Sequence, residues 1–390
     1  MDYTSEEILQ YIEEEDVKFI RLMFRDAYGV QKNISIMPGE LKKAFTDGVT
    51  INARRIDGFG DDSQHLYLKP DASTLAILPW RPESGRVIRM FCDVYTADGK
   101  PCEADTRVML ERAMAHADQE GIEFKFGSKS EFYLFKLDDE GNRTETPYDE
   151  AGYMDIAPAD KGENIRREIC LTIEEMGLRP ERSHHEQGPG QNEIDFHHGL
   201  PLEAADQMST FMMVVCTVAG RNGLYADFSP MPVKDNPGNG YHINIYATDK
   251  DGNDVCRYVA AGILDKIREI TLFLNPSEGS YRRFGTGTAP DRVNWSEGGE
   301  GALMHISERE MGVRTELRSP DALSNPYLAY SLLIEAGLYG IKNKLELPHL
   351  EADDELLLPQ SYKEACETAM KSDFVKEIVP TAVLQAYTNR

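Results

Sequence analysis

Residues 183–196 hold the densest group of side chains that could do chemistry. They read Ser-His-His-Glu-Gln-Gly-Pro-Gly-Gln-Asn-Glu-Ile-Asp-Phe, so three carboxylates and two imidazoles flank a Gly-Pro-Gly turn. From Asn192 onward polar and apolar residues alternate, which predicts a strand with Glu193, Asp195 and His197 on one face. Carboxylates on one face repel one another unless a cation lies among them. The segment is therefore either a divalent-metal site serving a phosphorylated substrate or a solvated hairpin beside a turn.

Other strand candidates also turn acidic, basic or imidazole groups to one side, while their opposite faces are largely apolar. An ordinary half-exposed sheet would carry Lys, Thr, Ser and Glu on its polar face. We therefore expect a cleft in which carboxylates hold Mg²⁺ or Mn²⁺ and arginines grip carboxylate or phosphate oxygens, as phosphoryl transfer requires. No Walker-type G-x-x-x-x-G-K-[ST] is present, which excludes a P-loop enzyme. The candidates are Glu131, Glu186, Glu193, His242 and Glu316 for the metal, and Arg283, Arg314 and Arg318 for the anion.

The elements that must position these residues fall into two predicted domains, 1–100 and 101–390. The first is β-rich, and the turn at 97–101 is its boundary. Its predicted elements are a helix over 5–15 and strands over 17–24, 30–36, 75–78 and 86–94. The second domain is mixed, with helices predicted over 105–120, 162–177, 203–222, 254–273, 324–344 and 360–373.

Composition narrows the function classes. The 390 residues include 42 basic and 67 acidic ones, a net charge of -25, which disfavours nucleic acid and anionic membranes as partners. No run of about 18 apolar residues is present to span a bilayer. The six cysteines are scattered and the first residues do not resemble a secretory signal, so we expect reduced thiols and a cytoplasmic protein.

Several motifs together resemble those of the glutamine synthetase family over nearly the whole chain. The run at 183–196 resembles the family's S-H-H-E-x-x-P-G-Q-x-E-I-D-F, and 152–155 fits the segment before it. The residues at 275–283 resemble N-P-x-x-x-S-Y-K-R, and 325–329 and 340–344 fit the C-terminal helices. Several long motifs in the right order make a chance similarity very improbable.

The resemblance implies a fold, an activity and a partner. The fold would be α+β, with an N-terminal β-grasp domain and a catalytic domain built on a curved antiparallel sheet flanked by helices. The reaction would use ATP to activate glutamate as γ-glutamyl phosphate, which ammonia then attacks, as part of nitrogen metabolism. Active sites would form between neighbouring subunits of a homo-oligomeric ring, commonly stacked as a dodecamer.

The resemblance also assigns roles residue by residue. Metal next to the acid substrate would be held by Glu131, Glu186 and Glu193. The second metal, under the ATP phosphates, would be held by His242 and Glu316. Arg283 and Arg318 would act in catalysis and substrate binding, with Gly238 as a further substrate contact and Arg314 as an ATP contact.

This chain departs from the family pattern at the chemistry. Lys129 stands where G-x-E-x-E-F has a carboxylate ligand, so the second metal site is expected to be weakened, and the Lys129 ammonium could partly replace the charge of the missing cation. Thr288 and Asn52 stand where the two acidic groups of the ammonium site belong. Glu300 replaces an arginine that grips phosphate, and Pro237 an asparagine that binds the glutamate backbone.

Three hypotheses remain open. The first is an ATP-dependent ligase that joins glutamate, or a similar acid, to an amine other than ammonia. The second is a non-catalytic homologue that binds a ligand or a partner subunit for regulation. The third is ordinary ammonia-dependent glutamine synthesis, for which each missing acidic group would have contributed about 10²–10⁴-fold.

Overall fold

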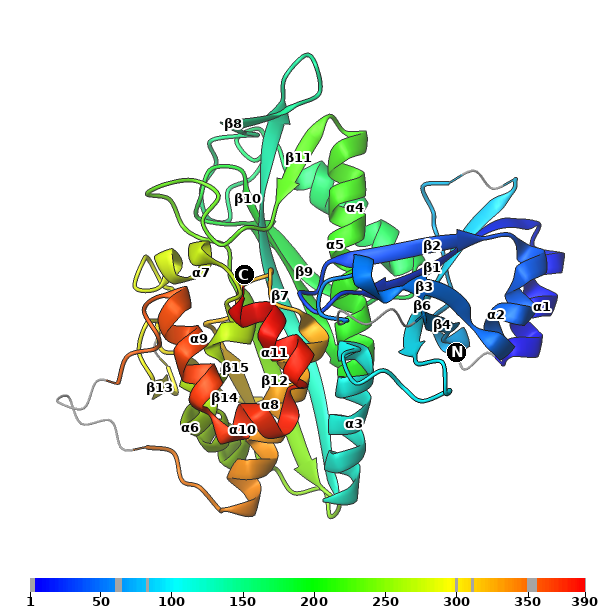
Figure 1. Cartoon of the computed structure of the whole chain (residues 1–390). Coiled ribbons are helices and arrows are strands. Elements are labelled where there is room, and N and C mark those ends of the chain that lie inside the picture. Colours follow the sequence, from blue (N-terminus) through cyan, green and yellow to red (C-terminus); the bar gives the residue numbers. More distant parts are fainter. Residues whose placement is uncertain are drawn as a thin grey trace.

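The computed structural model describes residues 4–59, 65–81, 84–298, 301–309, 312–348 and 356–389. Two sheets organise the chain, and the smaller one, formed by the N-terminal residues, lies to one side of the larger (Figure 1). The small sheet has the order β2-β1-β6-β4-β3, with β5 paired to β6, and its central β1 and β6 run parallel. Its strands are β1 (Val17–Arg25), β2 (Gln31–Ile36), β3 (Val49–Asn52), β4 (His65–Pro70), β5 (Ala76–Ile77) and β6 (Arg86–Tyr95).

Helices α1 (Ser5–Glu14) and α2 (Leu41–Asp47) belong to this N-terminal part. Helix α1 begins at a capping box, in which Thr4 and Glu7 each satisfy a backbone N–H of the other. The predicted strands over 17–24, 30–36 and 86–94 are confirmed within a residue or two. The short α2 was not predicted, because seven residues offer too little periodicity to identify a helix.

The larger sheet has nine strands in the order β13-β14-β15-β12-β7-β10-β9, and β8 and β11 also pair with β7. The long β7 runs through the middle of the molecule (Figure 1). The predicted antiparallel pairing holds for every pair except the short parallel β13 and β14 at one edge. The strands are β7 (Ile122–Leu137), β8 (Arg143–Pro147), β9 (Pro180–His185), β10 (Gln191–Gly199), β11 (Leu224–Asp227), β12 (Tyr241–Asp249), β13 (Trp295–Ser296), β14 (Met304–Arg309) and β15 (Gly312–Leu317).

Helices pack against this sheet and bury its apolar face. The six helices predicted for this part of the chain are all present, with ends that differ by a few residues. The predicted apolar stripe of α6 is confirmed, because Val259, Ile263, Ile267 and Ile270 are all fully buried. The helices are α3 (Thr106–Gln119), α4 (Glu163–Glu175), α5 (Pro201–Arg221), α6 (Cys256–Leu274), α7 (Glu278–Arg283), α8 (Pro326–Lys342), α9 (Tyr362–Lys371), α10 (Asp373–Ile378) and α11 (Thr381–Thr388).

Contacts between the two ends of the chain join the two sheets. The Tyr387 hydroxyl in α11 donates to the carbonyl of Ala27 at 3.0 Å, and its ring lies 5.2 Å from that of Tyr28. Asn325, which caps α8, donates to the same Ala27 carbonyl at 3.2 Å. The β1–β2 turn is thereby fixed to the helical layer of the larger sheet. Among the described helices, none combines the length and apolarity needed to cross a membrane.

Candidate active site

Strand register brings the predicted metal ligands to one face of the larger sheet. Glu193 in β10 lies directly opposite Glu131 in β7, and His242 in β12 lies opposite Lys129 in β7. Directly opposed residues of an antiparallel pair share a face, so these four side chains converge. Glu316 joins them from β15, where it pairs with Asn244, two residues along β12 from His242.

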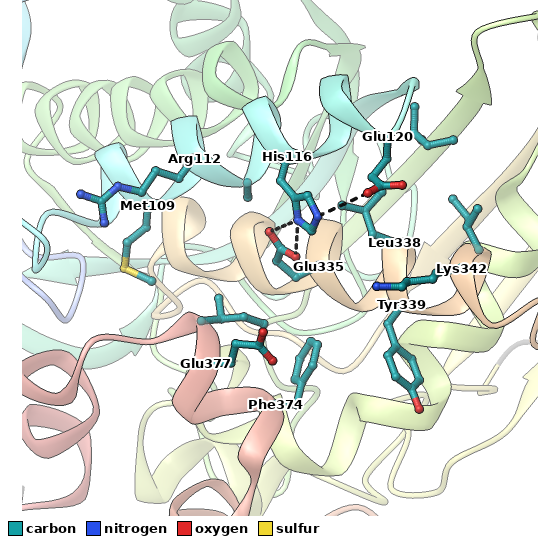
Figure 2. Close-up of a pocket in the computed structure, with 14 residues that line it drawn as sticks. Met109, Arg112, His116, Glu120, Glu335, Leu338, Tyr339, Lys342, Phe374 and Glu377 are labelled. Carbon is teal, nitrogen blue, oxygen red and sulfur yellow. Dashed lines mark hydrogen bonds and ion pairs between the residues drawn. The ribbon is translucent and has the colours of Figure 1, made fainter.

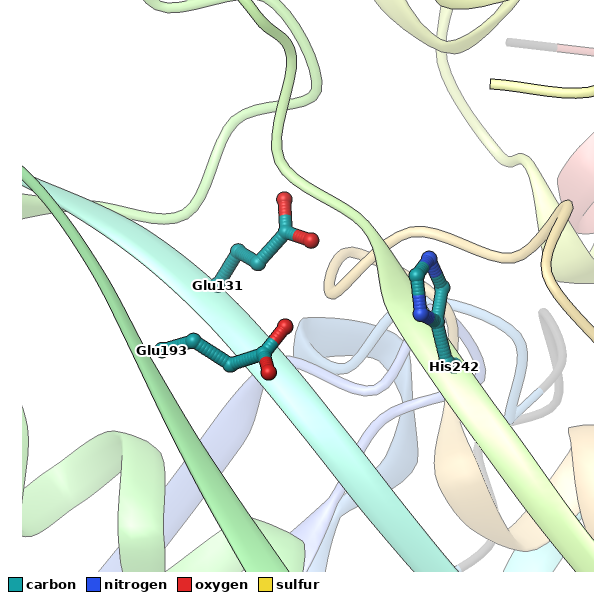
Figure 3. A group of neighbouring side chains, drawn as sticks. All are labelled: Glu131, Glu193 and His242. Carbon is teal, nitrogen blue, oxygen red and sulfur yellow. The ribbon is translucent and has the colours of Figure 1, made fainter. Parts of the chain in front are cut away.

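Two groups of side chains at this face could hold a metal ion. Ligand atoms of Glu131, Glu193 and His242 lie within 4.8 Å of one another, and Figure 3 shows both carboxylates beside the imidazole. His184, Glu186 and Glu193 form the second group under the same limit. Glu193 is common to both. The structure therefore gathers all three carboxylates predicted for the first metal, with a histidine at either end of the set.

Glu131, Glu186 and Glu193, which we name the carboxylate half, carry more negative charge than the chain neutralises. Burial, followed by the charges of Glu193 and Glu186, raises the pKa of Glu131 to about 8. Burial and the Glu193 charge also raise the pKa of Glu186. Glu131 is oriented by the Gly240 N–H at 2.8 Å and by Gln191 Nε2 at 3.2 Å. Oriented carboxylates with an excess of charge suit a divalent ion such as Mg²⁺ or Mn²⁺.

His184 is the main counter-charge of the carboxylate half. Its Nε2 lies 3.1 Å from Glu193 Oε1, and its Nδ1 lies 3.1 Å from the His185 carbonyl. The hydrogen bond to Glu193 raises the pKa of His184 to about 8. Burial alone would raise the pKa of Glu193, but the His184 hydrogen bond and the nearby His242 lower it to about 2. These neighbours favour the ionised form of Glu193, whereas burial and nearby carboxylates favour the protonated form of Glu131 when no metal is bound.

We name a second set the cation-paired half: Lys129, Arg314 and Glu316. In this half, basic side chains of the chain already neutralise the charge of the Glu316 carboxylate. Lys129 Nζ and His242 Nδ1 both lie 3.4 Å from Glu316 Oε1, and an Arg314 Nη lies 3.2 Å from Oε2. Burial works against ionisation, yet the His242 hydrogen bond and the surrounding cations hold the pKa of Glu316 well below its usual range. Burial lowers the pKa of His242, which lies between the two halves.

Two arginines near the metal ligands have no carboxylate partner within 4.0 Å in the part of the chain that the structure describes: Arg283 and Arg318. Arg283 is buried, and its guanidinium donates to the carbonyls of Ser319 and Pro320, the latter at 3.1 Å. The Nε atoms of Arg283 and Arg318 are buried without a hydrogen-bond partner. Guanidinium groups left without a carboxylate suit an anionic substrate.

Gly238 is required by the packing of Arg283. A Cβ atom there would lie 2.4 Å from the Pro230 carbonyl oxygen and 2.7 Å from Arg283 Cγ. The neighbouring Pro237 accepts a hydrogen bond from the Tyr133 hydroxyl at 2.7 Å. The loop that bears both residues therefore closes directly over the arginine stem.

A small cavity of about 40 Å³ is lined by Glu131 and Glu186 of the carboxylate half, by Arg283 and by residues 286–289. We name the segment 285–289 the flap. The flap is a tight turn, in which the Gly285 N–H donates to Ala289 at 3.1 Å and Thr286 Oγ1 donates to the Arg283 carbonyl at 2.6 Å. Thr288 is exposed and lines this cavity. The full lining is Glu131, Glu186, Gln187, Gln191, Pro237, Gly238, Gly240, His242, Arg283, Thr286, Gly287, Thr288 and Ala289.

Asn52 does not line the cavity of its own chain. It ends β3 in the N-terminal sheet, is exposed, and accepts a hydrogen bond from the Arg54 N–H at 3.1 Å. Glu300 lies outside the described residues. The roles assigned to both residues stay predictions.

Comparisons with known proteins agree with this arrangement. Residues 16–97 match the glutamine synthetase β-grasp domain, and residues 103–390 match the glutamine synthetase catalytic domain. The chain belongs to the glutamine synthetase family. The predicted fold, a β-grasp domain followed by a catalytic domain on a curled sheet, is thereby confirmed.

Individual relatives support the same family. A glutamine synthetase from Clostridium saccharobutylicum is 41% identical over 378 residues, which cover 93% of this chain and 85% of the relative. One from Methanosarcina mazei is 39% identical over 413 residues, covering 98% of this chain and 92% of the relative. A structure of GmaS in complex with ADP aligns with a TM-score of 0.88 over 100% of this chain and 94% of that one, at 22% identity. Apo GmaS aligns with a TM-score of 0.86.

Members of the glutamine synthetase family use ATP and divalent metals, and the gathered acidic and histidine groups of this chain are consistent with that use. Membership of this family indicates that the chain is a ligase.

Sequence reasoning gave no role to several residues that shape this family site. His184 was part of the first motif, but its bond to Glu193 was not anticipated. His185 is buried, with Nδ1 2.7 Å from the Glu186 carbonyl and Nε2 2.9 Å from Asp149. Asp149 in turn accepts from the Gly190 N–H at 3.0 Å. This network fixes the turn that carries Glu186, and no local pattern indicates it because Asp149 is 36 residues distant in sequence.

Two larger cavities lie elsewhere. One of about 490 Å³ lies between α3, α8 and α10, where His116 and Glu335 point toward each other (Figure 2). Another of about 430 Å³ lies between the two sheets, lined by Arg89 and Arg107 among others. No predicted site residue lines either. The predicted site residues therefore gather at the converging carboxylates and not at these larger cavities.

Proposed function

We propose that this chain is an ATP-dependent ligase that activates a carboxylic acid, glutamate or a close relative, as an acyl phosphate and joins it to an amine other than ammonia. The observation that carries the proposal is the flap. It contributes only Thr286, Gly287, Thr288 and Ala289 to a cavity that Glu131 and Glu186 also line. The metal and acid side of the site is acidic, and the side where the amine would enter is neutral.

The neutral side matters because ammonia arrives as ammonium. A cationic nucleophile needs a negative group to attract it and a base to remove its proton. Thr288 can do neither at neutral pH, and Asn52 likewise carries an amide in place of an acid. A larger or less basic amine would be bound by packing and hydrogen bonds, for which a threonine-lined flap is suitable.

The acid side would work through groups present in this chain. Arg283 and Arg318 would bind the carboxylate of the acid and the oxygens of the transferred phosphoryl group, and Arg314 would contact ATP. When bound by Glu131, Glu186 and Glu193, a divalent ion would supply charge stabilisation to those oxygens. The Pro237–Gly238 loop and the flap would keep water away from the acyl phosphate.

We further propose a homo-oligomeric ring. The Asn52 loop lies outside the cavity of its own chain, so it can approach an amine site only from a neighbouring subunit. The oligomer is usual for the family. Size-exclusion chromatography with light scattering would measure the number of subunits.

The decisive experiment measures ADP release with ATP, Mg²⁺ or Mn²⁺, glutamate and a panel of amines that includes ammonium, with products identified by mass spectrometry. We expect an amide product with at least one substituted amine. The rate with ammonium should be lower than the rate with that amine by a factor of about 10² or more. The double variant Asn52→Asp with Thr288→Glu should raise the ammonium rate, while Gln119→Glu, at the exposed last residue of α3, should not.

Ordinary rates with ammonium would overturn the proposal in favour of glutamine synthesis, the function named for the relatives at about 40% identity. No ADP release with any pair, together with thermal stabilisation by glutamate or ATP, would instead identify a non-catalytic ligand-binding homologue.

A further inference from the structure

We propose that this site binds one divalent cation, and that the ammonium of Lys129 takes the place of a second. The inference rests on the proposed function only in assuming that the gathered carboxylates bind a metal. The resemblance to the family assigned His242 and Glu316 to a second ion. The residues present here do not fit that ion.

The first argument is the occupancy of Glu316. Each of its two oxygens already faces nitrogen: Oε1 lies 3.4 Å from both Lys129 Nζ and His242 Nδ1, and Oε2 lies 3.2 Å from Arg314. The carboxylate is 4% exposed, so solvent reaches little of it. A divalent ion binds a carboxylate oxygen at about 2.0–2.6 Å and needs that oxygen free of a competing cation.

The second argument is the position of Lys129. It lies opposite His242 on one side and opposite Asp195 on the other, so β7 places it between the strands that carry the ligands. Its side chain is 17% exposed. An ion held by His242 and Glu316 would share Glu316 Oε1 with this ammonium. Repulsion between like charges so close together weakens binding by orders of magnitude at the effective dielectric of a partly buried site.

The carboxylate half, by contrast, is free to bind a metal ion, so we expect one bound ion and not none. No lysine or arginine lies within 4.0 Å of Glu131, Glu186 or Glu193 among the residues that the structure describes. Of the described basic side chains, His184 alone lies within 4.0 Å of them, and a histidine yields its proton to a metal readily. The first ion therefore keeps its ligands.

A fixed ammonium differs from a bound ion in what it offers the substrate. Lys129 Nζ has three N–H groups, of which Glu316 takes one, so the others are free to meet a phosphate oxygen as a point charge. This charge cannot be lost by dilution or chelation. The enzyme would need only enough free Mg²⁺ to fill one site and to accompany ATP.

The test is a count of Mn²⁺ bound per chain by the metal-free protein, without nucleotide, acid or amine, by isothermal titration and by electron paramagnetic resonance. We expect one tight site in the native chain and a second in Lys129→Glu, with affinity at least 10²-fold above any second site of the native protein. Lys125→Glu, on the same strand but 39% exposed and paired with Glu123, should keep one site.

Two tight sites or none in the native chain would overturn the inference, as would one site in a Lys129→Glu variant that melts at the native temperature. If that variant fails to fold, the native count decides alone. Because no substrate is present, failure to find an amide product would leave this count unchanged. The two proposals therefore fail separately.

Discussion

The two halves of the site treat negative charge in opposite ways, although strand β7 contributes a residue to each, Glu131 to the carboxylate half and Lys129 to the cation-paired half. The carboxylate half leaves Glu131 with a pKa raised to about 8 by burial and by its acidic neighbours. The cation-paired half surrounds Glu316 with Lys129, Arg314 and His242 and keeps its pKa low. A buried glutamate therefore lacks a lysine or arginine counter-charge in the carboxylate half and has both in the cation-paired half. The difference lies in the basic side chains that reach each carboxylate: Lys129 and Arg314 lie within 3.4 Å of Glu316, whereas no lysine or arginine among the described residues lies within 4.0 Å of Glu131.

The largest effect should follow from removing a ligand in the carboxylate half. Glu131→Gln keeps an oxygen for the Gly240 N–H but removes a charge that the metal needs, so we expect the apparent metal affinity and the ligase rate each to fall about 10²–10⁴-fold. Glu145→Gln, an exposed position in β8, should change neither. Steady-state kinetics at several Mg²⁺ concentrations measures both, and native kinetics in Glu131→Gln would contradict the metal assignment.

Gly238→Ala should produce the next effect, because it disturbs the arginine side while leaving both halves intact. The new methyl group would lie 2.4 Å from a carbonyl oxygen and 2.7 Å from Arg283, so the loop or the arginine must move. We expect about 1–3 kcal/mol of destabilisation and a raised KM for the acid. Gly220→Ala, in α5 with nothing within 4 Å of its Cβ, should be neutral or stabilise by up to about 1 kcal/mol. Urea unfolding of both variants tests this, and equal stabilities would contradict the packing argument.

Lys129→Met should have a smaller effect on stability, which sharpens the comparison between the halves. Glu316 would lose one counter-charge but keep Arg314 and His242, so we expect a loss of about 1–2 kcal/mol. Lys125→Met breaks only an exposed pair and should cost less than about 0.5 kcal/mol. A Lys129→Met protein as stable as the Lys125→Met one would mean that Lys129 contributes nothing to holding Glu316.

Stability should also depend on pH in the absence of metal. Glu131 has a pKa of about 8 in the folded chain against 4.5 as its ordinary value, and His184 about 8 against 6.5. Between the ordinary and the folded pKa values of these two groups, the folded protein holds protons that the unfolded chain releases. Stability should therefore fall as pH rises from about 5 to 8. Glu193, with a folded pKa of about 2, titrates outside this window. Melting temperatures with EDTA measure the fall.

Saturating Mg²⁺ should flatten that decline, since the ion displaces the Glu131 proton. Without metal, Glu131→Gln should also make the decline of stability with pH less steep, by the part of the decline that the titration of Glu131 causes. A decline that is equally steep in the native protein and in the variant would assign the titration to other groups.

Local sequence patterns were enough to predict which candidate residues share a face, because alternation and helical spacing decide that geometry. Alternation in β10 and β12 was enough to place Glu193 and His242 on polar faces, and helical spacing was enough to predict the core face of α6. The contacts of Lys129 could not be predicted this way. They depend on which residue of β12 lies opposite it and on how far β15 extends, and both are set by packing across 187 residues of sequence. Short helices such as α7 and α10 were not predicted, because six residues, like the seven of α2, show too little periodicity.

The convergence of single residues from separate strands has a consequence for how this family diversifies. Glu193, Lys129, His242 and Glu316 each come from a different strand, and none contributes its side chain to the backbone pairing that holds the sheet together. Natural selection can therefore exchange one member of the set at a time while the scaffold persists. A lineage can pass from one reaction to another through a series of folded intermediates, each a single substitution from the last.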